Sequence, residues 1–244
     1  MNRGYKMSTK SALVVIPTTG ANTLVDAVNS VVNQTHVNTT CLVIIDGPQF
    51  ETAAHAILDK FPTVKRMSLP WNTGANGWYG HRIYFLSAPL MDQDYWLALD
   101  QDNWFEADHV ATMIDACEHN NWLWCHSLRK IYDAQRKYIC DDDCESLGRW
   151  PIYVSDQHHL VDTSTYCIRK DVIVNMAPAW YSGWGGDRRF YSIIAQHVAD
   201  FGCTGLSTVG YRLDGNPHSV NADFFIKGNE IMQQRYPNGF PWRR

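Results

Sequence analysis

Long apolar stretches are absent from this chain of 244 residues. No apolar run approaches the ~20 residues that a helix needs to cross a bilayer. The first ten residues, MNRGYKMSTK, also lack the apolar segment of a signal peptide. The seven cysteines are an odd number and are scattered along the chain, which favours free thiols over a disulfide framework. These absences predict a cytoplasmic protein without a transmembrane segment.

A surplus of positive charge is also missing. Lys and Arg total 21 against 25 Asp and Glu, which gives a formal net charge of -4. General attraction to nucleic acid or to an anionic membrane is therefore not expected, although a local basic patch is still compatible with this total. Aromatic residues, by contrast, make up 13% of the chain and include ten Trp. Tryptophan packs cores and also forms flat platforms for sugar rings and bases, and composition does not choose between these uses.

Three frequent enzyme signatures are missing as well. The sequence has no Walker-type glycine loop, no Gly-x-Gly-x-x-Gly after its first apolar run and no Gly-x-Ser-x-Gly motif. It also shows no internal repeat and no low-complexity linker. At 45% hydrophobic residues the chain can bury a substantial core. We therefore expect a single domain over residues 1–244.

Short apolar runs alternate with helix-like segments over the first hundred residues. Thr23 is expected to cap the first helix, and Pro17 to end the first strand because proline cannot donate to a central ladder. Buried strands that alternate with helices predict an α/β fold, a Rossmann-like mixed, mainly parallel sheet with helices on both faces. The predicted strands are 11–18, 41–46, 64–69 and 95–99, and the predicted helices are 24–32, 51–60, 79–87 and 108–118.

The second half of the sequence is less regular. Two short segments, HSLRKIYD and RKYIC, predict a hairpin that turns at Ala134 and Gln135. Further strands are expected at 164–169 and 206–213, and further helices at 187–201 and 223–234.

Acidic residues follow the fourth predicted strand directly. Ligands of such sheets bind beyond the carboxyl ends of the strands, so Asp100 and Asp102 are placed where a site is expected. Two carboxylates at this spacing can both turn toward one Mg²⁺ or Mn²⁺ ion. The same letters occur at Asp92-Gln93-Asp94, but these residues precede the strand and are expected to close a solvated turn at its other end.

The order of the segments in the first 105 residues resembles that of a known enzyme family. VVIPTTGANTLVDAVNSVVNQTHVNTTCLVIIDG, then NTGANGWYGHR and then YWLALDQDN are similar to the nucleotide-binding half of glycosyltransferase family 2, which has the GT-A fold. The resemblance implies a nucleotide-sugar-binding half at 1–104 and an acceptor-binding half at 105–244. The sequence departs from the family at Gly47, where relatives often carry a second acid after the one matched by Asp46.

The resemblance also implies roles for individual residues of the first half. Pro17, Thr18 and Asp46 correspond to positions that line the base and ribose pocket. Asn72, Gly74 and Arg82 lie in the segment whose counterparts approach the nucleotide and diphosphate, where the planar guanidinium of an arginine suits phosphate oxygens. A surface arginine is the equally weighted alternative for Arg82. Asp100 and Gln101 complete this nucleotide-binding set.

A second informative segment, SGWGGDRRF, lies in the acceptor half. Gly185 and Gly186 permit a tight backbone approach, and Asp187 then opens a helix whose dipole favours an ionised carboxylate. The segment resembles the Gly-Trp-Gly-Gly-acid run of beta-galactosyltransferases and the corresponding acid of family 2 enzymes. By this resemblance Asp187 would deprotonate the acceptor hydroxyl; the simpler alternative is a helix cap.

Other residues have both a functional and a structural interpretation. By the resemblance, His218 is a further metal ligand, and a solvent-exposed loop histidine is the alternative; an imidazole there would favour Mn²⁺ over Mg²⁺. Trp180, Tyr181 and Trp184 flank the proposed base and form either a wall against a sugar ring or anchors in the core. Cys125-His126 with Cys140 and Cys144 could form a zinc site, but their loose spacing argues against it.

These observations together predict a metal-dependent, inverting glycosyltransferase that uses a nucleotide-diphosphate sugar, with UDP favoured. A sugar-phosphate nucleotidyltransferase and a non-catalytic carbohydrate-binding protein of the same fold are the alternatives. The expected acceptor is a hydroxyl-bearing molecule: a soluble or lipid-linked glycan, a protein or a modified base in DNA. The net charge gives DNA no positive support.

Overall fold

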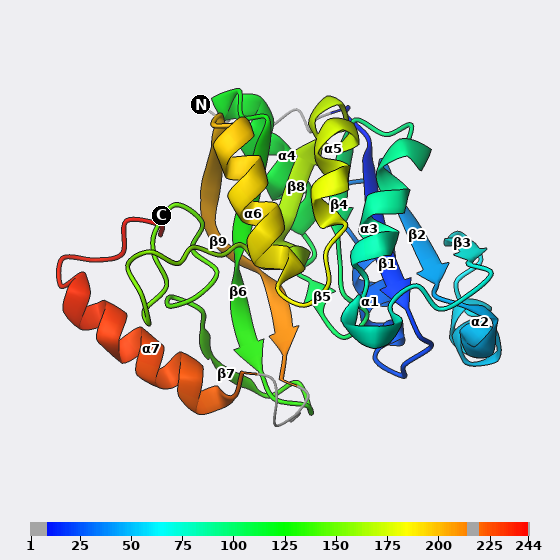
Figure 1. Ribbon diagram of the computed structural model, residues 1–244, viewed down its shortest axis with the longest axis horizontal. Helices are drawn as coiled ribbons and strands as arrows, with labels where there is room; N and C mark the ends of the chain where they lie inside the picture. The colour runs from blue at the N-terminus through cyan, green and yellow to red at the C-terminus, as the bar shows by residue number, and fades with distance from the viewer. Residues whose placement is uncertain (1–8, 214–219, 244) are drawn as a thin grey trace, which may run out of the picture.

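One mixed β-sheet runs through the protein and carries all the other elements on its two faces. The computed structural model describes residues 9–213 and 220–243. Within these residues the sheet has nine strands, in the order β3-β2-β1-β4-β8-β6-β9-β5, with β7 paired to β6. The arrows of β1, β2, β6 and β9 point toward the same edge in Figure 1. That edge is where the carboxyl ends of these strands meet.

The first half of the chain forms the parallel part of the sheet. It consists of β1 (Ala12–Thr18), β2 (Thr39–Ile45), β3 (Lys65–Ser68) and β4 (Tyr95–Ala98). Parallel pairs join β1 to β2 and to β4, and β2 to β3. Every residue of β1 is buried, as expected for a central strand covered on both faces.

β1 ends at Thr18, the predicted last residue, but Pro17 lies within its ladder, so the expectation that this proline cannot stand in a central ladder was wrong. It stands opposite Ile44 in the register with β2. On the other side, the ladder with β4 ends where Leu99 donates to the carbonyl of Val15. In a strand, the backbone N–H and C=O groups of every second residue point toward the same neighbouring strand. Because those of Val15 point toward β4, an N–H at Pro17 would also point toward β4, just beyond the last residue pair of the β1–β4 ladder. No hydrogen bond is lost there.

Helices cover both faces of the sheet, as predicted. Val14 and Ile16 of β1 belong to a hydrophobic cluster with α1 (Leu24–Val32), α2 (Glu51–Leu58) and α4 (His109–Asn120). Leu13 and Val15 belong to the opposite cluster, with α3 (His81–Ser87), α5 (Lys170–Met176) and α6 (Gly186–His197). Figure 1 shows α3, α5 and α6 in front of the sheet and α4 behind it. Thr23 makes no side-chain cap to α1, contrary to prediction.

The second half of the chain adds antiparallel strands. They are β5 (Trp104–Phe105), β6 (Trp124–Tyr132), β7 (Tyr138–Asp141), β8 (Tyr166–Arg169) and β9 (Phe201–Arg212). The predicted hairpin is formed by β6 and β7. In the sheet, β8 lies antiparallel between β4 and β6, and β9 runs parallel to β6. The parallel pairings still contain most of the paired residues.

Two predicted elements of this half have different bounds. The helix expected at 187–201 ends at His197, and Phe201 begins β9 instead. Gly205 interrupts the strand pattern with a φ of 76°, close to a shift in the register with β6.

α7 (Ala222–Arg235) packs on a third cluster around Leu128 and Phe225. Short 3₁₀ helices are formed by Pro48–Phe50, Ala75–Gly77, Ala88–Leu90, Thr163–Thr165 and Ala177–Trp180.

Among the described residues, no helix is both long enough and apolar enough to cross a membrane.

Candidate active site

A cleft of about 690 Å³ opens at the carboxyl edge of the sheet. It is lined by residues from both halves of the chain. Those that the sequence had indicated are Pro17, Thr18, Asp46, Asn72, Gly74, Asp100, Gln101, Asp102, Trp184, Gly185 and Asp187. The structure therefore brings most of the predicted site into one cleft.

A second cavity, of about 780 Å³, lies at the amino edge and contains Asp92 and Asp94. Asp94 accepts hydrogen bonds from the backbone N–H and the hydroxyl of Ser11, and Lys10 lies 3.7 Å from its carboxylate. These bonds, with the backbone one first, lower the pKa of Asp94. Cavity volume alone therefore does not identify the site. At the amino edge, Ser11 and Lys10 already provide hydrogen bonds and a positive charge to Asp94.

Asp100 stands directly after β4 at the floor of the carboxyl-edge cleft. The hydroxyl of Tyr84 donates to its Oδ1 over 2.6 Å, and its backbone N–H donates to the Ser164 hydroxyl over 3.1 Å. Burial of the carboxyl group, followed by the charges of Asp102 and Asp162, raises the pKa of Asp100 to about 7. Mutual repulsion of these carboxylates and their desolvation therefore cost free energy when all are ionised, and a bound cation would reduce that cost.

The loop after Asp100 is tied to β9. The guanidinium Nε of Arg212 donates to the backbone carbonyl of Asp102 over 3.0 Å. The side chain of Asn103 is buried, accepts from the Arg212 backbone N–H and donates to Ser164. These bonds fix the path of the loop that carries both predicted metal-binding carboxylates.

Gln101 links the same loop to the end of β1. Its Oε1 accepts from the Thr18 hydroxyl over 2.7 Å and from the Thr19 backbone N–H over 3.1 Å. Its Nε2 donates to the Thr19 hydroxyl. Gln101 and Thr18 thus form one wall of the cleft.

Asp46 holds the loop that follows β3. Its Oδ1 accepts from the backbone N–H and the hydroxyl of Thr73, both over 2.7 Å, and its Oδ2 accepts from the backbone N–H of Gly74 over 2.8 Å. A Cβ atom at Gly74 would lie 2.4 Å from the carbonyl of Tyr79, so the loop needs glycine here. The resemblance assigned Asp46 to the base pocket. In this structure its carboxylate is occupied by the loop at Thr73 and Gly74 and thereby shapes the wall of the cleft.

Asn72 has an acceptor without a partner. Its Oδ1 is buried and makes no hydrogen bond in the structure, although the residue lines the cleft. A buried polar atom left in this way costs free energy unless a ligand or water supplies a donor. The donor groups of a nucleotide, its ribose hydroxyls and base N–H, fit this requirement.

Asp187 lies in the first turn of α6, on the side of the cleft formed by the second half of the chain. The residue at the helix cap is Gly185, in the left-handed conformation with φ of 78°, so the alternative role of Asp187 as the cap itself does not hold. Its Oδ1 accepts from the backbone N–H of Arg188 over 2.8 Å. A Cβ atom at Gly186 would lie 2.5 Å from the imidazole of His81, so this glycine lets α6 begin against α3.

The three aromatic residues proposed as a wall separate into different environments. Trp180 is fully buried, stacks on Phe190 with ring centroids 4.0 Å apart and belongs to the core. Tyr181 contacts Trp78 and does not line the cleft. Trp184 lines the cleft and is 77% exposed. The wall prediction therefore keeps only Trp184.

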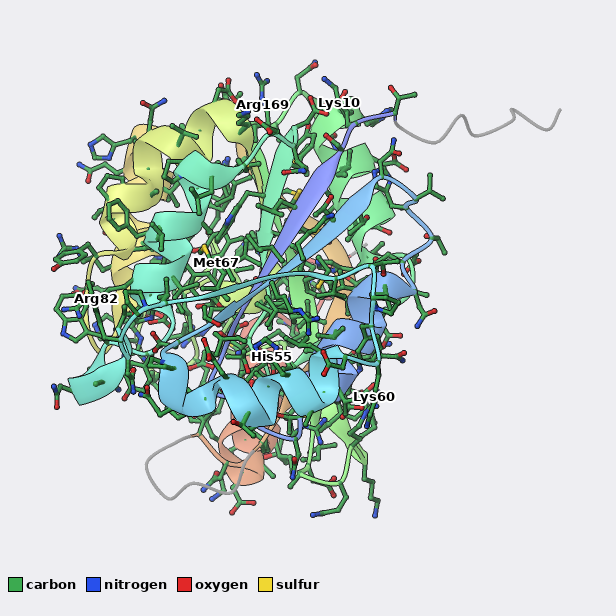
Figure 2. The ribbon with its side chains drawn as sticks, turned by 90° about the vertical axis from the view of Figure 1, so that its right-hand side faces the viewer. Lys10, His55, Lys60, Met67, Arg82 and Arg169 are labelled. Atoms are coloured by element: carbon green, nitrogen blue, oxygen red, sulfur yellow. The ribbon has the colours of Figure 1, made fainter. Side chains whose placement is uncertain are left out.

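Arg82 does not line the cleft either. Its guanidinium stacks 3.7 Å from the ring centroid of Trp78 and donates to the carbonyl of Thr73. Arg82 belongs to the first turn of α3, and Figure 2 labels its position. In the structure Arg82 hydrogen-bonds to the loop at Thr73 that Asp46 also holds.

Trp104, which follows the acidic pair, is a buried residue of β5.

The sequence did not indicate one charged cluster of the cleft. Arg129 of β6 donates to Asp142, Glu145 and Asp162, each over 2.7 Å. All four are buried, and Arg129, Glu145 and Asp162 line the cleft. No spacing signal marks the cluster, because 13 to 33 residues separate Arg129 from its three partners and the pairing arises only in the fold.

Two metal predictions remain to be placed. His218 lies outside the described residues. Cys125 and Cys144 belong to different hydrophobic clusters, which agrees with the sequence argument against a zinc site of Cys125, His126, Cys140 and Cys144. In the described part of the chain, the group of metal-ligating side chains that does converge is Cys117, Cys125 and Cys167.

Solved structures with a similar fold include TarS of S. aureus. TarS 1-349 superposes with a TM-score of 0.63 at 11% identity, covering 83% of this chain and 60% of that chain. Its complex with UDP gives 0.65 at 12% identity, with 94% and 66% of the two chains covered. The complex with UDP-GlcNAc gives 0.65 at 13%, with 92% and 65% covered. This chain thus spans about 60–66% of those TarS chains.

The likeness to TarS confirms the expected GT-A fold. A search of curated protein sequences gave no match. The family model described as Glycosyl transferase family 2 matches residues 13–153, more than half of the chain. The chain belongs to glycosyl transferase family 2.

Proposed function

We propose that the protein transfers a sugar from a UDP-sugar to an acceptor hydroxyl, with a divalent metal ion and with inversion at the anomeric carbon. One observation carries the proposal: a single cleft holds Asp100 and Asp102 after β4 and Asp187 at the start of α6. The two acidic sites come from separate segments of the chain, and each has a different task in this reaction. The family and the fold support it, since similar structures were solved with UDP and UDP-GlcNAc.

The nucleotide is proposed to bind against the first half of the chain, residues 1–104. Pro17, Thr18 and Asn72 line this side of the cleft, and the buried Oδ1 of Asn72 requires a donor. Gln101 and Asp46 hold the loops of this wall in place. The residues therefore select a ligand with hydroxyl and N–H donors next to a diphosphate.

The metal ion, Mn²⁺ or Mg²⁺, is proposed to bind at Asp100 and Asp102, with His218 as a third candidate ligand. Hard carboxylate oxygens suit either ion, and the raised pKa of Asp100 marks a site short of positive charge. When bound, the ion neutralises the diphosphate and makes it a better leaving group. Tyr84 and Ser164 orient the Asp100 carboxylate.

Asp187 is proposed to act as the general base. Its carboxylate takes the proton of the acceptor hydroxyl, whose oxygen then forms a bond to the anomeric carbon. The bond from that carbon to the diphosphate oxygen breaks at the same time, and UDP leaves with the electron pair. A single displacement of this kind inverts the anomeric centre. Residues 105–244, which contain Asp187 and Trp184, form the acceptor half.

The acceptor is proposed to be a hydroxyl-bearing glycan or a similar molecule, including a lipid-linked glycan, a protein or a modified DNA base. The proposed location is the cytoplasm. All seven cysteines are free, which fits a reducing compartment.

The decisive experiment compares two double variants that remove the same charges from the two ends of β4. Asp100→Asn with Asp102→Asn should abolish Mn²⁺-dependent binding of UDP, measured by calorimetry, and UDP release from UDP-sugars. Asp92→Asn with Asp94→Asn should retain both. Intact metal-dependent binding and turnover in the first variant would overturn the mechanism. Release of pyrophosphate from a nucleoside triphosphate and a sugar phosphate would instead indicate a nucleotidyltransferase.

A further inference from the structure

Three thiols meet in the core, away from the cleft. Cys117 comes from α4, Cys125 from β6 and Cys167 from β8. Their Sγ atoms all lie within 4.8 Å of one another, and each residue is at most 1% exposed. Cys125 and Cys167 are directly opposite in the antiparallel ladder, and Cys117 covers them from the helix. Two neighbouring strands and one helix therefore bring three cysteine sulfur atoms, which are soft metal ligands, close together.

The spacing of the sulfur atoms matches coordination of one ion. A zinc–thiolate bond is about 2.3 Å long, so three sulfur atoms around one zinc ion are roughly 4 Å apart. The observed separations, all within 4.8 Å, need shifts of only a fraction of an ångström per atom to reach this value. The backbone carbonyl of Met113, 3.3 Å from the Cys125 sulfur, adds an oxygen at the edge of the group.

The thiols also affect one another's protonation. Hydrogen bonds from the thiols of Cys125, the larger effect, and Cys167 lower the pKa of Cys117 to about 5. Burial raises the pKa values of Cys125 and Cys167. The guanidinium of Arg169 stabilises the Cys117 thiolate further.

The cluster has a route to solvent at the amino edge of the sheet. Cys117 lines the 780 Å³ cavity there, together with Tyr95, Glu118 and Arg169. In Figure 2, Arg169 and Lys10, another residue of this cavity, lie near each other, and Arg82 lies well apart from both. An ion can thus enter from the end of the molecule opposite the proposed catalytic cleft.

We propose that Cys117, Cys125 and Cys167 form a site for one thiophilic divalent ion, with Zn²⁺ as the biological candidate. Soft thiolate ligands select such ions, whereas the carboxylates of the cleft select hard ones. Binding converts the three groups to thiolates, and every thiol proton that is displaced goes to solvent. The product carries one net negative charge, which the nearby Arg169 cation offsets. The described residues supply three side-chain ligands, and the fourth position is left to water or to the Met113 carbonyl.

Cd²⁺ is the probe for the test, because its thiolate complexes absorb in the ultraviolet. The reduced, chelator-treated full-length protein is titrated with Cd²⁺ and then with Zn²⁺ in competition. One Cd²⁺ per chain, a thiolate charge-transfer band and a release of protons into weak buffer are expected. Zn²⁺ should displace the band and raise the melting temperature of the protein.

Matched variants separate this site from the other cysteines. Cys140→Ala with Cys203→Ala removes the two partly exposed thiols, and Cys41→Ala removes a buried thiol of the same hydrophobic cluster. These variants should keep the band, whereas Cys117→Ala and Cys167→Ala should each lower Cd²⁺ affinity at least 100-fold. A folded wild-type protein that binds no Cd²⁺ would overturn the proposal, as would a band that persists in both single variants. Circular dichroism confirms that each variant is folded.

Discussion

Asp92 and Asp94 precede β4, and Asp100 and Asp102 follow it, with glutamine between the acids in both cases. At the amino end, Asp94 receives two hydrogen bonds from Ser11 and a nearby Lys10, and its pKa is lowered. At the carboxyl end, Asp100 is partly buried beside Asp102 and Asp162, and desolvation followed by these charges raises its pKa to about 7. The same short motif therefore lies beside a lysine at one end of the strand and beside further carboxylates at the other.

The position in the fold, more than the motif, decides what the acids can do. In the parallel part of the sheet, the carboxyl edge gathers loops from several strands into one cleft. Buried acids there gain from a bound cation, whereas exposed ion pairs at the amino edge contribute little. The following substitutions test this contrast, because each compares a residue of the cleft with a similar residue at the amino edge.

Asp187→Asn should have the largest effect on activity. Loss of a general base lowers the rate by about 10²–10⁴-fold, with UDP binding retained. Asp171→Asn is the control, because Asp171 also lies in a first helical turn but at the amino edge, where it pairs with Arg169. The measurement is UDP release with a UDP-sugar and a calorimetric affinity for UDP. Turnover of Asp187→Asn within a few-fold of wild type would exclude the proposed base.

Arg129→Met should have the largest effect on stability. It leaves the carboxylates of Asp142, Glu145 and Asp162 buried without their cation, which costs about 3–5 kcal/mol. Arg169→Met should change the free energy of unfolding by less than about 1 kcal/mol, because its ion pair with Asp171 is exposed. Urea unfolding monitored by tryptophan fluorescence measures both. Equal losses would mean that the cleft cluster contributes no more than a surface pair.

Asp100→Asn and Asp94→Asn should shift stability in opposite directions in the metal-free protein. The pKa of Asp100 rises from 3.8 to about 7 on folding, so its contribution is full below 3.8 and lost as pH rises through 7. Asp100→Asn should therefore raise the melting temperature at pH 8 by several degrees, since about 1 kcal/mol corresponds to roughly 2–4 °C in a chain of this size.

For Asp94 the sign is reversed. Its pKa is lowered on folding, so its contribution is present above its ordinary value of 3.8 and lost as pH falls through the lowered pKa. Asp94→Asn should thus lower the free energy of unfolding at pH 8 by less than about 1 kcal/mol, and the melting temperature only slightly, because the site is largely exposed. Thermal melts at pH 5 and pH 8 in the presence of a chelator check both variants. A destabilised Asp100→Asn at pH 8 would contradict the proposed cluster of unpaired acids.

The sequence was informative where local pattern determines the structure. The apolar run before Thr18 predicted β1 to within one residue, because a strand buried on both faces needs a continuous apolar sequence. It was less informative for β9, where Gly202 and Gly205 interrupt the pattern at the start of the strand. The bounds of that strand depend on its partner β6, which no local signal reveals.

The candidate site shows the same limit. Asp100, Asp102 and Asp187 could be identified from strand ends, helix starts and the resemblance to a family. Trp180 and Trp184 could not be distinguished, because only tertiary packing buries the first and leaves the second exposed in the cleft.

The order of strands determines what a cut in the chain would do. Residue 104 separates the two proposed functional halves, yet Trp104 belongs to β5 and pairs with Gly210 of β9. At the same time β4, from the first half, hydrogen-bonds to β8, from the second. Produced alone, the first fragment would expose the backbone edge of β4 and would be prone to aggregate. The two proposed functional halves therefore share one sheet and are not expected to be exchangeable as modules; under the proposed function, new acceptor specificities would arise by changes in the loops at the carboxyl edge.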